Sequence, residues 1–158
     1  MNFSADLLTL LKFFEGCRLT AYQDIRGVWT IGFGHTGDDV YEGLTISQDQ
    51  SDNLLQQDLA KFVTGVANLL EDCTVTQSQF DALIDFSYNL GTHALSESTL
   101  LKLIKAGDMD NAANEFPRWS HAGATVVRGL YIRRMTERYL FVNNQLPPEG
   151  LDAFRNSL

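Results

Sequence analysis

The chain has 158 residues, of which 44% are hydrophobic, and its formal net charge at pH 7 is −8. This length suits one domain with a sizeable core, which a cleft can still divide into two lobes. Two cysteines exclude a disulfide-rich scaffold, and a net acidic chain without a recognition motif argues against nucleic acid as a partner.

The first predicted helix lies in the opening stretch MNFSADLLTLLKFFEG. Ser4 is a suitable N-cap, and the leucines and phenylalanines that follow recur at helical spacing. Gly16 is well placed to end this helix in the left-handed conformation, which makes Glu15 its last residue.

The same stretch lacks the features of an export signal or a membrane anchor. Asp6 and Lys12 interrupt its apolar run, and neither a basic leading region nor a small-residue cleavage site is present. We therefore expect synthesis in the cytoplasm and no stable membrane association.

A β-hairpin is predicted next, because the hydrophobic period changes to two from Leu19 onward. The segments LTAYQD and VWTIGFG read as its strands and IRG as its turn. If the hairpin is centred on Gly27, position 24 stands opposite 30, and one polar face forms that resembles the wall of a cleft. Its residues are Thr20, Tyr22, Asp24, Thr30, Gly32 and Gly34.

The remainder of the chain is predicted to be mostly helical. After a polar loop at residues 37–45, Ser47 and Gln50 form a capping-box pattern at the start of a long helix that we expect to join two lobes. Further helix starts and one stop follow, and a final amphipathic run, GLYIRRMTERYLF, ends the helical pattern. The starts are at Thr76, Ser98 and Asp108, and the stop is at Pro117.

Charge is unevenly distributed along the chain. Residues 1–75 carry 4 Lys and Arg against 11 Asp and Glu, whereas residues 76–158 carry 8 against 9. Between Arg118 and Arg138 there are five arginines and a single acid, Glu137. This segment is predicted to form a local basic patch that could meet an anionic polymer.

Glu15, Asp24 and Thr30 are the candidate catalytic residues. The carbonyl end of a helix disfavours negative charge, so we expect Glu15 to hold a proton, whereas Asp24 at the lip of a turn should stay ionised. Two carboxyl groups separated in this way can serve as acid and base at one pH, with the Thr30 hydroxyl helping to hold a water. Taken alone, however, a Glu before a glycine and an Asp before a turn are ordinary surface features.

The spacing of these residues resembles the motif of the phage-type lysozymes, the muramidase endolysins of glycoside hydrolase family 24. Here E-G is followed nine positions later by Asp and six later again by Thr, within WTIGFGH. ALIDFSYNLG, EFPRW and the final run also fall in the family's order, so the resemblance spans nearly the whole chain. It implies that Glu15 is the general acid, that Asp24 acts on the attacking water and that Thr30 supports this water.

The resemblance also suggests residues that bind substrate. Asn89 looks like the family position that hydrogen-bonds the glycan, although a C-capping role explains it nearly as well. Arg133 falls where the family places an arginine near the catalytic Glu, and Tyr22 and Gly32 belong to the polar hairpin face. His35 matches a family histidine for which we expect a structural hydrogen bond that holds the lobe.

The fold implied by this resemblance is α+β and lysozyme-like, with the active site between a small hairpin lobe and a larger helical lobe. We expect a single lysozyme domain over residues 1–158, with a hairpin lobe at 13–46, a connecting helix at 47–71 and a helical lobe at 72–158 against which residues 1–12 pack. The acidic net charge departs from strongly basic lysozymes, and SHAGATVV after Trp119 departs from the shortest family members.

The implied reaction is hydrolysis, with inversion, of the β-1,4 bond between N-acetylmuramic acid and N-acetylglucosamine in peptidoglycan, which lyses the host cell. No metal or cofactor is required. We expect a monomer, released by a holin from the cytoplasm to act on the wall in the periplasm. Two alternatives are a lytic transglycosylase, against which Asp24 and Thr30 argue, and a catalytically inactive wall-binding lysozyme domain.

Overall fold

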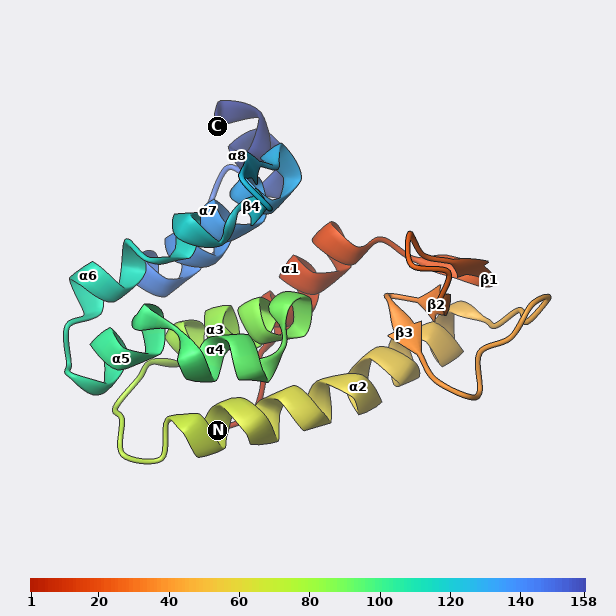
Figure 1. Cartoon of the computed structure of the whole chain (residues 1–158), viewed down its shortest axis with the longest axis horizontal. Helices are drawn as coiled ribbons and strands as arrows, with labels where there is room; N and C mark the ends of the chain where they lie inside the picture. The colour runs from red at the N-terminus through yellow and green to blue at the C-terminus, as the bar shows by residue number, and fades with distance from the viewer. The chain divides into compact units, whose positions relative to one another are not determined.

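The computed structural model describes all residues, 1–158, as two compact units. The sheet unit is Leu11–Lys61, and the helical unit combines Met1–Leu10 with Phe62–Leu158. Helices α1 (Ala5–Glu15) and α2 (Gln48–Leu69) each contain a boundary between the units. Figure 1 traces the elements in chain order, and the mixture of helices with a small sheet confirms the α+β prediction.

The sheet unit contains three antiparallel strands in the order β1-β2-β3. These are β1 (Arg18–Gln23), β2 (Trp29–Gly32) and β3 (His35–Thr36), so the predicted hairpin is confirmed. The predicted polar loop contributes more than expected, because Ala21 N donates to Leu44 O and Ile46 N donates to Leu19 O along the free edge of β1. Segment 44–46 therefore covers an edge that the hairpin alone would leave open.

The predicted register of the hairpin is wrong by two residues. Tyr22, not Asp24, lies opposite Thr30, and Gln23 lies opposite Trp29. The reason is the turn, which takes in Asp24 and Val28: Asp24 N donates to Val28 O at 2.9 Å, and Gly27 N donates to Asp24 O at 2.9 Å. Because the shift is even, Tyr22 and Thr30 still share one face of the hairpin.

Two glycines shape the sheet unit. Gly16 follows α1 with φ of +63°, so the predicted left-handed helix end is confirmed. Gly32 has φ of +64°, and a Cβ on it would lie 2.9 Å from Ser51 Oγ on α2. A side chain at position 32 would therefore strain the backbone and push the strand away from α2.

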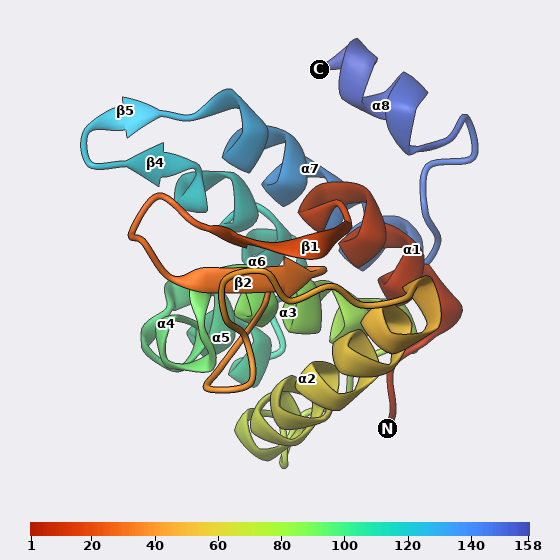
Figure 2. The same ribbon diagram turned by 90° about the vertical axis from the view of Figure 1, so that its right-hand side faces the viewer.

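The helical unit is built from short helices around α3 and α7, which pack against each other. Figure 2 shows the β4–β5 ribbon leading into α7. The ribbon is formed by the segment after Trp119, and neither it nor α4 and α8 was predicted. The elements are α3 (Gln77–Leu90), α4 (Thr92–Glu97), α5 (Thr99–Lys105), α6 (Met109–Ala113), the 3-10 helix η1 (Phe116–Trp119), β4 (His121–Ala122), β5 (Thr125–Val126), α7 (Arg128–Asn143) and α8 (Leu151–Ser157).

The predicted helix caps are confirmed. Thr76 and Gln79 form a reciprocal capping box at α3, as Ser47 and Gln50 do at α2. Ser98 accepts from Leu101 N at the start of α5, and Asp108 and Ser4 cap α6 and α1 in the same way. Each cap satisfies backbone donors that the helix leaves free, which is why the start sites could be read from local sequence.

The core of the helical unit contains interlocking aromatic rings. The Phe86 and Phe116 ring centroids are 6.0 Å apart, and those of Phe116 and Phe141 are 5.4 Å apart, both in edge-to-face geometry. All three side chains are buried, so they fix the packing of α3, η1 and α7. None of the helices combines the length and the apolar character that a membrane crossing requires.

Candidate active site

Glu15 is the last residue of α1 and is half-buried. The end of α1 is tied to α2 by Lys12, whose Nζ lies 3.0 Å from Asp52 Oδ1 and 5.4 Å from the ring centroid of Phe33. The hydrogen bond from Lys12 is the main cause that lowers the pKa of Asp52. This anchor restricts the helix end that carries Glu15.

Asp24 is held by the turn that it begins. Its Oδ1 accepts from Arg26 N at 2.8 Å and from Val28 N at 2.9 Å, and Arg26 Nη2 lies 3.7 Å from its Oδ2. The N–H of Val28 is the largest cause that lowers the pKa of Asp24, and the backbone and charge of Arg26 add to it. This direction agrees with the expectation that Asp24 is ionised, and it leaves Oδ2 as the oxygen with free acceptor capacity.

Thr30 is connected to Asp24 through a single residue, Val28. Thr30 is 4% exposed, and its Oγ1 donates to Val28 O at 2.9 Å. The same carbonyl accepts from Asp24 N, while Val28 N donates to the Asp24 carboxylate. One peptide segment therefore fixes both side chains, although they are not opposite each other in the register.

Arg18 was not predicted as a site residue. Its guanidinium Cζ lies 4.3 Å from the ring centroid of Tyr22, the residue opposite Thr30. The available signal was its even position in the same strand as Tyr22, which placed it on the same face of the hairpin.

His35 makes the structural hydrogen bonds that were expected of it. Its Nδ1 lies 2.8 Å from Asp58 Oδ2 on α2, and its Nε2 lies 3.0 Å from Asp39 Oδ2. Burial alone would lower the pKa of His35, but the hydrogen bonds to Asp58 and Asp39 outweigh this and the pKa is raised. The carboxylate at each ring nitrogen stabilises the imidazolium, and the contact with Asp58 joins β3 to α2.

The raised pKa of His35 makes stability depend on pH. The contacts of His35 with Asp58 and Asp39 stabilise the fold fully below about pH 6.5, which is the pKa of histidine in the unfolded chain. This contribution is lost as the pH rises through the pKa of His35 in the folded protein. We expect the free energy of unfolding, measured with urea, to fall over this range in the wild type and to be flatter in His35→Gln. The control His93→Gln, at an exposed position in α4, should keep the wild-type slope, and an unchanged slope in His35→Gln would contradict the assignment.

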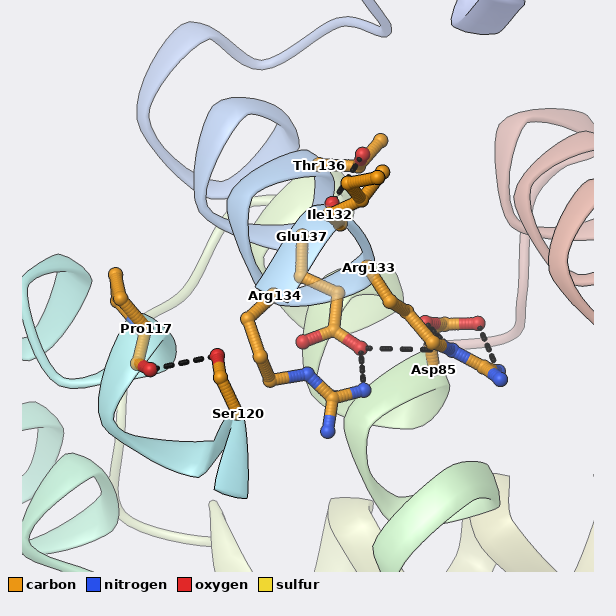
Figure 3. Close-up of polar contacts among 8 residues, drawn as sticks. All are labelled: Asp85, Pro117, Ser120, Ile132, Arg133, Arg134, Thr136 and Glu137. Carbon is orange, nitrogen blue, oxygen red and sulfur yellow. Dashed lines mark hydrogen bonds and ion pairs between the residues drawn. The ribbon is translucent and has the colours of Figure 1, made fainter. Parts of the chain in front are cut away.

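Arg133 lies in the helical unit, where it forms a buried bidentate pair with Asp85. Its Nε and Nη2 donate to the two Asp85 oxygens at 2.9 Å each (Figure 3). Burial alone would raise the pKa of Asp85, but the charge and hydrogen bonds of Arg133 lower it. The expected contact of Arg133 with Glu15, and its role in substrate binding, stay predictions.

Arg134 and Glu137 complete this buried cluster of charges. Arg134 Nη2 donates to Glu137 Oε1, and both side chains are fully buried (Figure 3). Burial raises the pKa of Glu137 well above its usual range, and the charge of Arg134 does not compensate. Arg134 Nε and Nη1 and Glu137 Oε2 have no hydrogen-bond partner.

The predicted basic patch is therefore reduced, because two of its five arginines, Arg133 and Arg134, are inside the helical unit. Of the other three, Arg118 pairs with Glu115 at 3.4 Å, and Arg138 donates to Asn114. A count of charges along the sequence does not separate arginines on the surface from those in the core.

Asn89, a predicted glycan-binding residue, lies one residue before the end of α3. The capping reading is not supported, because Gly91 is the C-cap and its N–H donates to Ser87 O. Asn89 Oδ1 is buried without a hydrogen-bond partner. An acceptor left in this state favours the glycan-binding role, which stays a prediction, as do the roles of Tyr22 and Gly32.

Comparison with known proteins identifies related chains. The family model described as phage lysozyme matches residues 12–137. The endolysin of Bacillus phage B103 is 46% identical over 147 residues, 92% of this chain, but this chain spans only 56% of that relative. The endolysin of Salmonella phage P22 is 37% identical and is covered to 99%, with 90% of this chain aligned.

A similar fold is found among solved structures. The muramidase domain of SpmX from Asticaccaulis excentricus superposes with a TM-score of 0.84 at 36% identity, covering 89% of this chain and 97% of that domain. The lysozyme-like fold predicted from the sequence is confirmed by this likeness.

Proposed function

Because the chain belongs to the phage lysozyme family, we propose that it is an endolysin that hydrolyses the β-1,4 bond between N-acetylmuramic acid and N-acetylglucosamine in peptidoglycan. The mechanism depends on one observation: the backbone of Val28 donates to the Asp24 carboxylate and accepts from the Thr30 hydroxyl. The lowered pKa of Asp24 keeps its carboxyl ionised. Glu15, five residues before Thr20 of the polar hairpin face, supplies the acid. Peptidoglycan glycan strands are its partner.

The water is oriented by the direction of the Thr30 hydrogen bond. Thr30 has one hydroxyl proton, and Val28 O accepts it, so a water can only donate to Thr30 Oγ1. The second proton of that water is donated to Asp24 Oδ2, because Oδ1 already accepts two backbone N–H groups. The lone pairs of the water are then free to point at the anomeric carbon.

The bond changes follow from these roles. Glu15 protonates the leaving oxygen as the glycosidic bond breaks, and the water oxygen bonds to the anomeric carbon from the opposite face. Asp24 accepts the proton that the water loses. The lowered pKa of Asp24 keeps this base ionised, and neither a metal ion nor a cofactor takes part in the proposal.

The stereochemistry of the first product tests this mechanism. Inverting enzymes hold their carboxyl groups roughly 6.5 to 9.5 Å apart to leave room for a water, whereas retaining enzymes bring them to roughly 5 to 5.5 Å. We expect the α-anomer at the new reducing end, observed by proton NMR before mutarotation. A β-anomer would contradict the role of Asp24, and a 1,6-anhydro end would instead identify a transglycosylase.

The proposal also includes where the enzyme acts. The protein is synthesised in the host cytoplasm, a holin releases it through the membrane, and it acts on the wall as a monomer, which together would explain lysis. Mass analysis of the fragments from a peptidoglycan digest with purified protein tests the activity itself, since an inactive wall-binding domain releases no fragments.

A further inference from the structure

Arg18 places a positive charge beside Tyr22 on the polar face of the hairpin. Its guanidinium lies over the ring of Tyr22, and Tyr22 is directly opposite Thr30. Arg18 itself pairs with Gly32, two residues along β2 from Thr30, which corresponds to about 7 Å of strand. The side chain of Arg18 reaches along β1 to the residue that is paired with Thr30.

This guanidinium has no carboxylate partner in the chain. Among the four lysines and arginines of the sheet unit, Lys12 pairs with Asp52 and Arg26 lies near Asp24, whereas Arg18 and Lys61 form no ion pair. The same residues, 11–61, carry eight acids, so an unpaired arginine is not explained by a shortage of anions. The five N–H donors of Arg18 are left to water or to a ligand.

Tyr22 restricts Arg18 without neutralising it. Stacking on the ring limits the conformations of a long side chain while the residue stays exposed to solvent. A cation held in this way loses less conformational entropy on binding, and its fork of donors matches the two oxygens of a carboxylate. The arrangement is therefore suited to an anion carried by the substrate.

We propose that Arg18 binds a carboxylate on the muramic acid branch of peptidoglycan, and so selects peptide-bearing wall glycan over neutral N-acetylglucosamine polymers. This inference rests on the proposed function. The sugar rings of the glycan are uncharged. Its negative charges are the carboxylates of the attached peptides and, on muramic acid residues without a peptide, the lactyl carboxylate. Arg18 is a specificity residue, and Tyr22 is the residue that positions it.

The test compares Arg18→Gln with wild type on intact peptidoglycan and on peptidoglycan whose carboxylates have been converted to neutral amides. On intact walls the variant should show KM raised about 10-fold, the order expected for one charge-assisted contact, with kcat within about twofold. On amidated walls the two proteins should have the same KM. The matched control is Lys61→Gln, which removes the other unpaired cation of the sheet unit and should behave as wild type on both.

A third substrate distinguishes the two sources of the carboxylate. Removing the peptides frees the lactyl carboxylate, which peptide-bearing strands use in the amide bond to the peptide. An Arg18→Gln effect that disappears on this glycan assigns a peptide carboxylate, and one that persists shows that Arg18 also binds the free lactyl carboxylate. Arg18→Lys, which keeps the charge but loses the planar fork, should lie between the two. Thermal unfolding of each variant checks that the fold is retained.

Two results would overturn the proposal: wild-type KM for Arg18→Gln on intact walls, or an equal loss on intact and amidated walls, which would indicate a structural role. Calorimetric binding of a soluble glycopeptide fragment separates this proposal from the hydrolysis itself. If the protein binds the glycopeptide only when Arg18 is present but releases no soluble products from walls, the proposed hydrolysis is contradicted and the carboxylate contact still holds.

Discussion

Glu15→Gln is expected to lower turnover of peptidoglycan by about 10² to 10⁴-fold, because the amide keeps the volume of the side chain but has no transferable proton. Glu15 is half-buried at the end of α1, where a neutral replacement of equal size leaves the packing intact. The fold should therefore be retained, which urea denaturation checks. The rate of release of soluble fragments, followed by mass, is the measurement.

The matched control is Glu42→Gln, which makes the same chemical change at an exposed position in the loop before α2. It should digest walls at the wild-type rate. If Glu15→Gln digests walls at a rate comparable to wild type, Glu15 is not the acid. The unfolding curve shows whether a loss of activity comes from a loss of the fold.

Asp85→Ala should strongly destabilise the helical unit. Asp85 is fully buried and accepts both hydrogen bonds from Arg133, so its removal takes a paired anion away from a buried cation. Breaking a buried pair in this way typically costs about 3 to 5 kcal/mol. Urea denaturation followed by circular dichroism measures the loss.

Two further variants show whether the pair itself is responsible. Asp152→Asn removes an acid from an exposed pair with Arg155 and should cost less than about 1 kcal/mol. Replacing Asp85 and Arg133 together by Ala and Met removes both charges, and it should recover part of the loss. If the double variant is no more stable than Asp85→Ala, the cost comes from the cavity rather than from the loss of the Asp85–Arg133 contact.

The local parts of the fold could be predicted from sequence, because their causes lie within a few residues. The capping boxes at Ser47 and Thr76 are examples: each pairs a side chain with a backbone N–H three residues away. The hairpin was likewise predicted, but its register was not. Asp24 belongs to the turn because its carboxylate accepts hydrogen bonds from Arg26 N and Val28 N. The alternation of residues along a strand gives no information about such contacts.

The buried charges could not be placed by counting. Arg133, Arg134 and Glu137 read as one polar face of the last helix, and only Asp85 on α3 shows that this face is inside. A signal was available in FDALIDFS, where two acids four positions apart share one side of a helix and have apolar residues next to them in the sequence. That pattern predicts buried partners, although it does not name them.

The contact of Ser4 with Asp81 constrains the order in which the chain can fold as it leaves the ribosome. Ser4 donates to a carboxylate 77 positions further along, within a unit that also requires residues up to 158. Every internal contact of Leu11–Lys61 is available once residue 61 has been synthesised. Residues 1–10 can make their contacts only after α3 has been synthesised. During synthesis, the C-terminal end of α1 can therefore pack within the sheet unit while its N-terminal end still lacks Asp81.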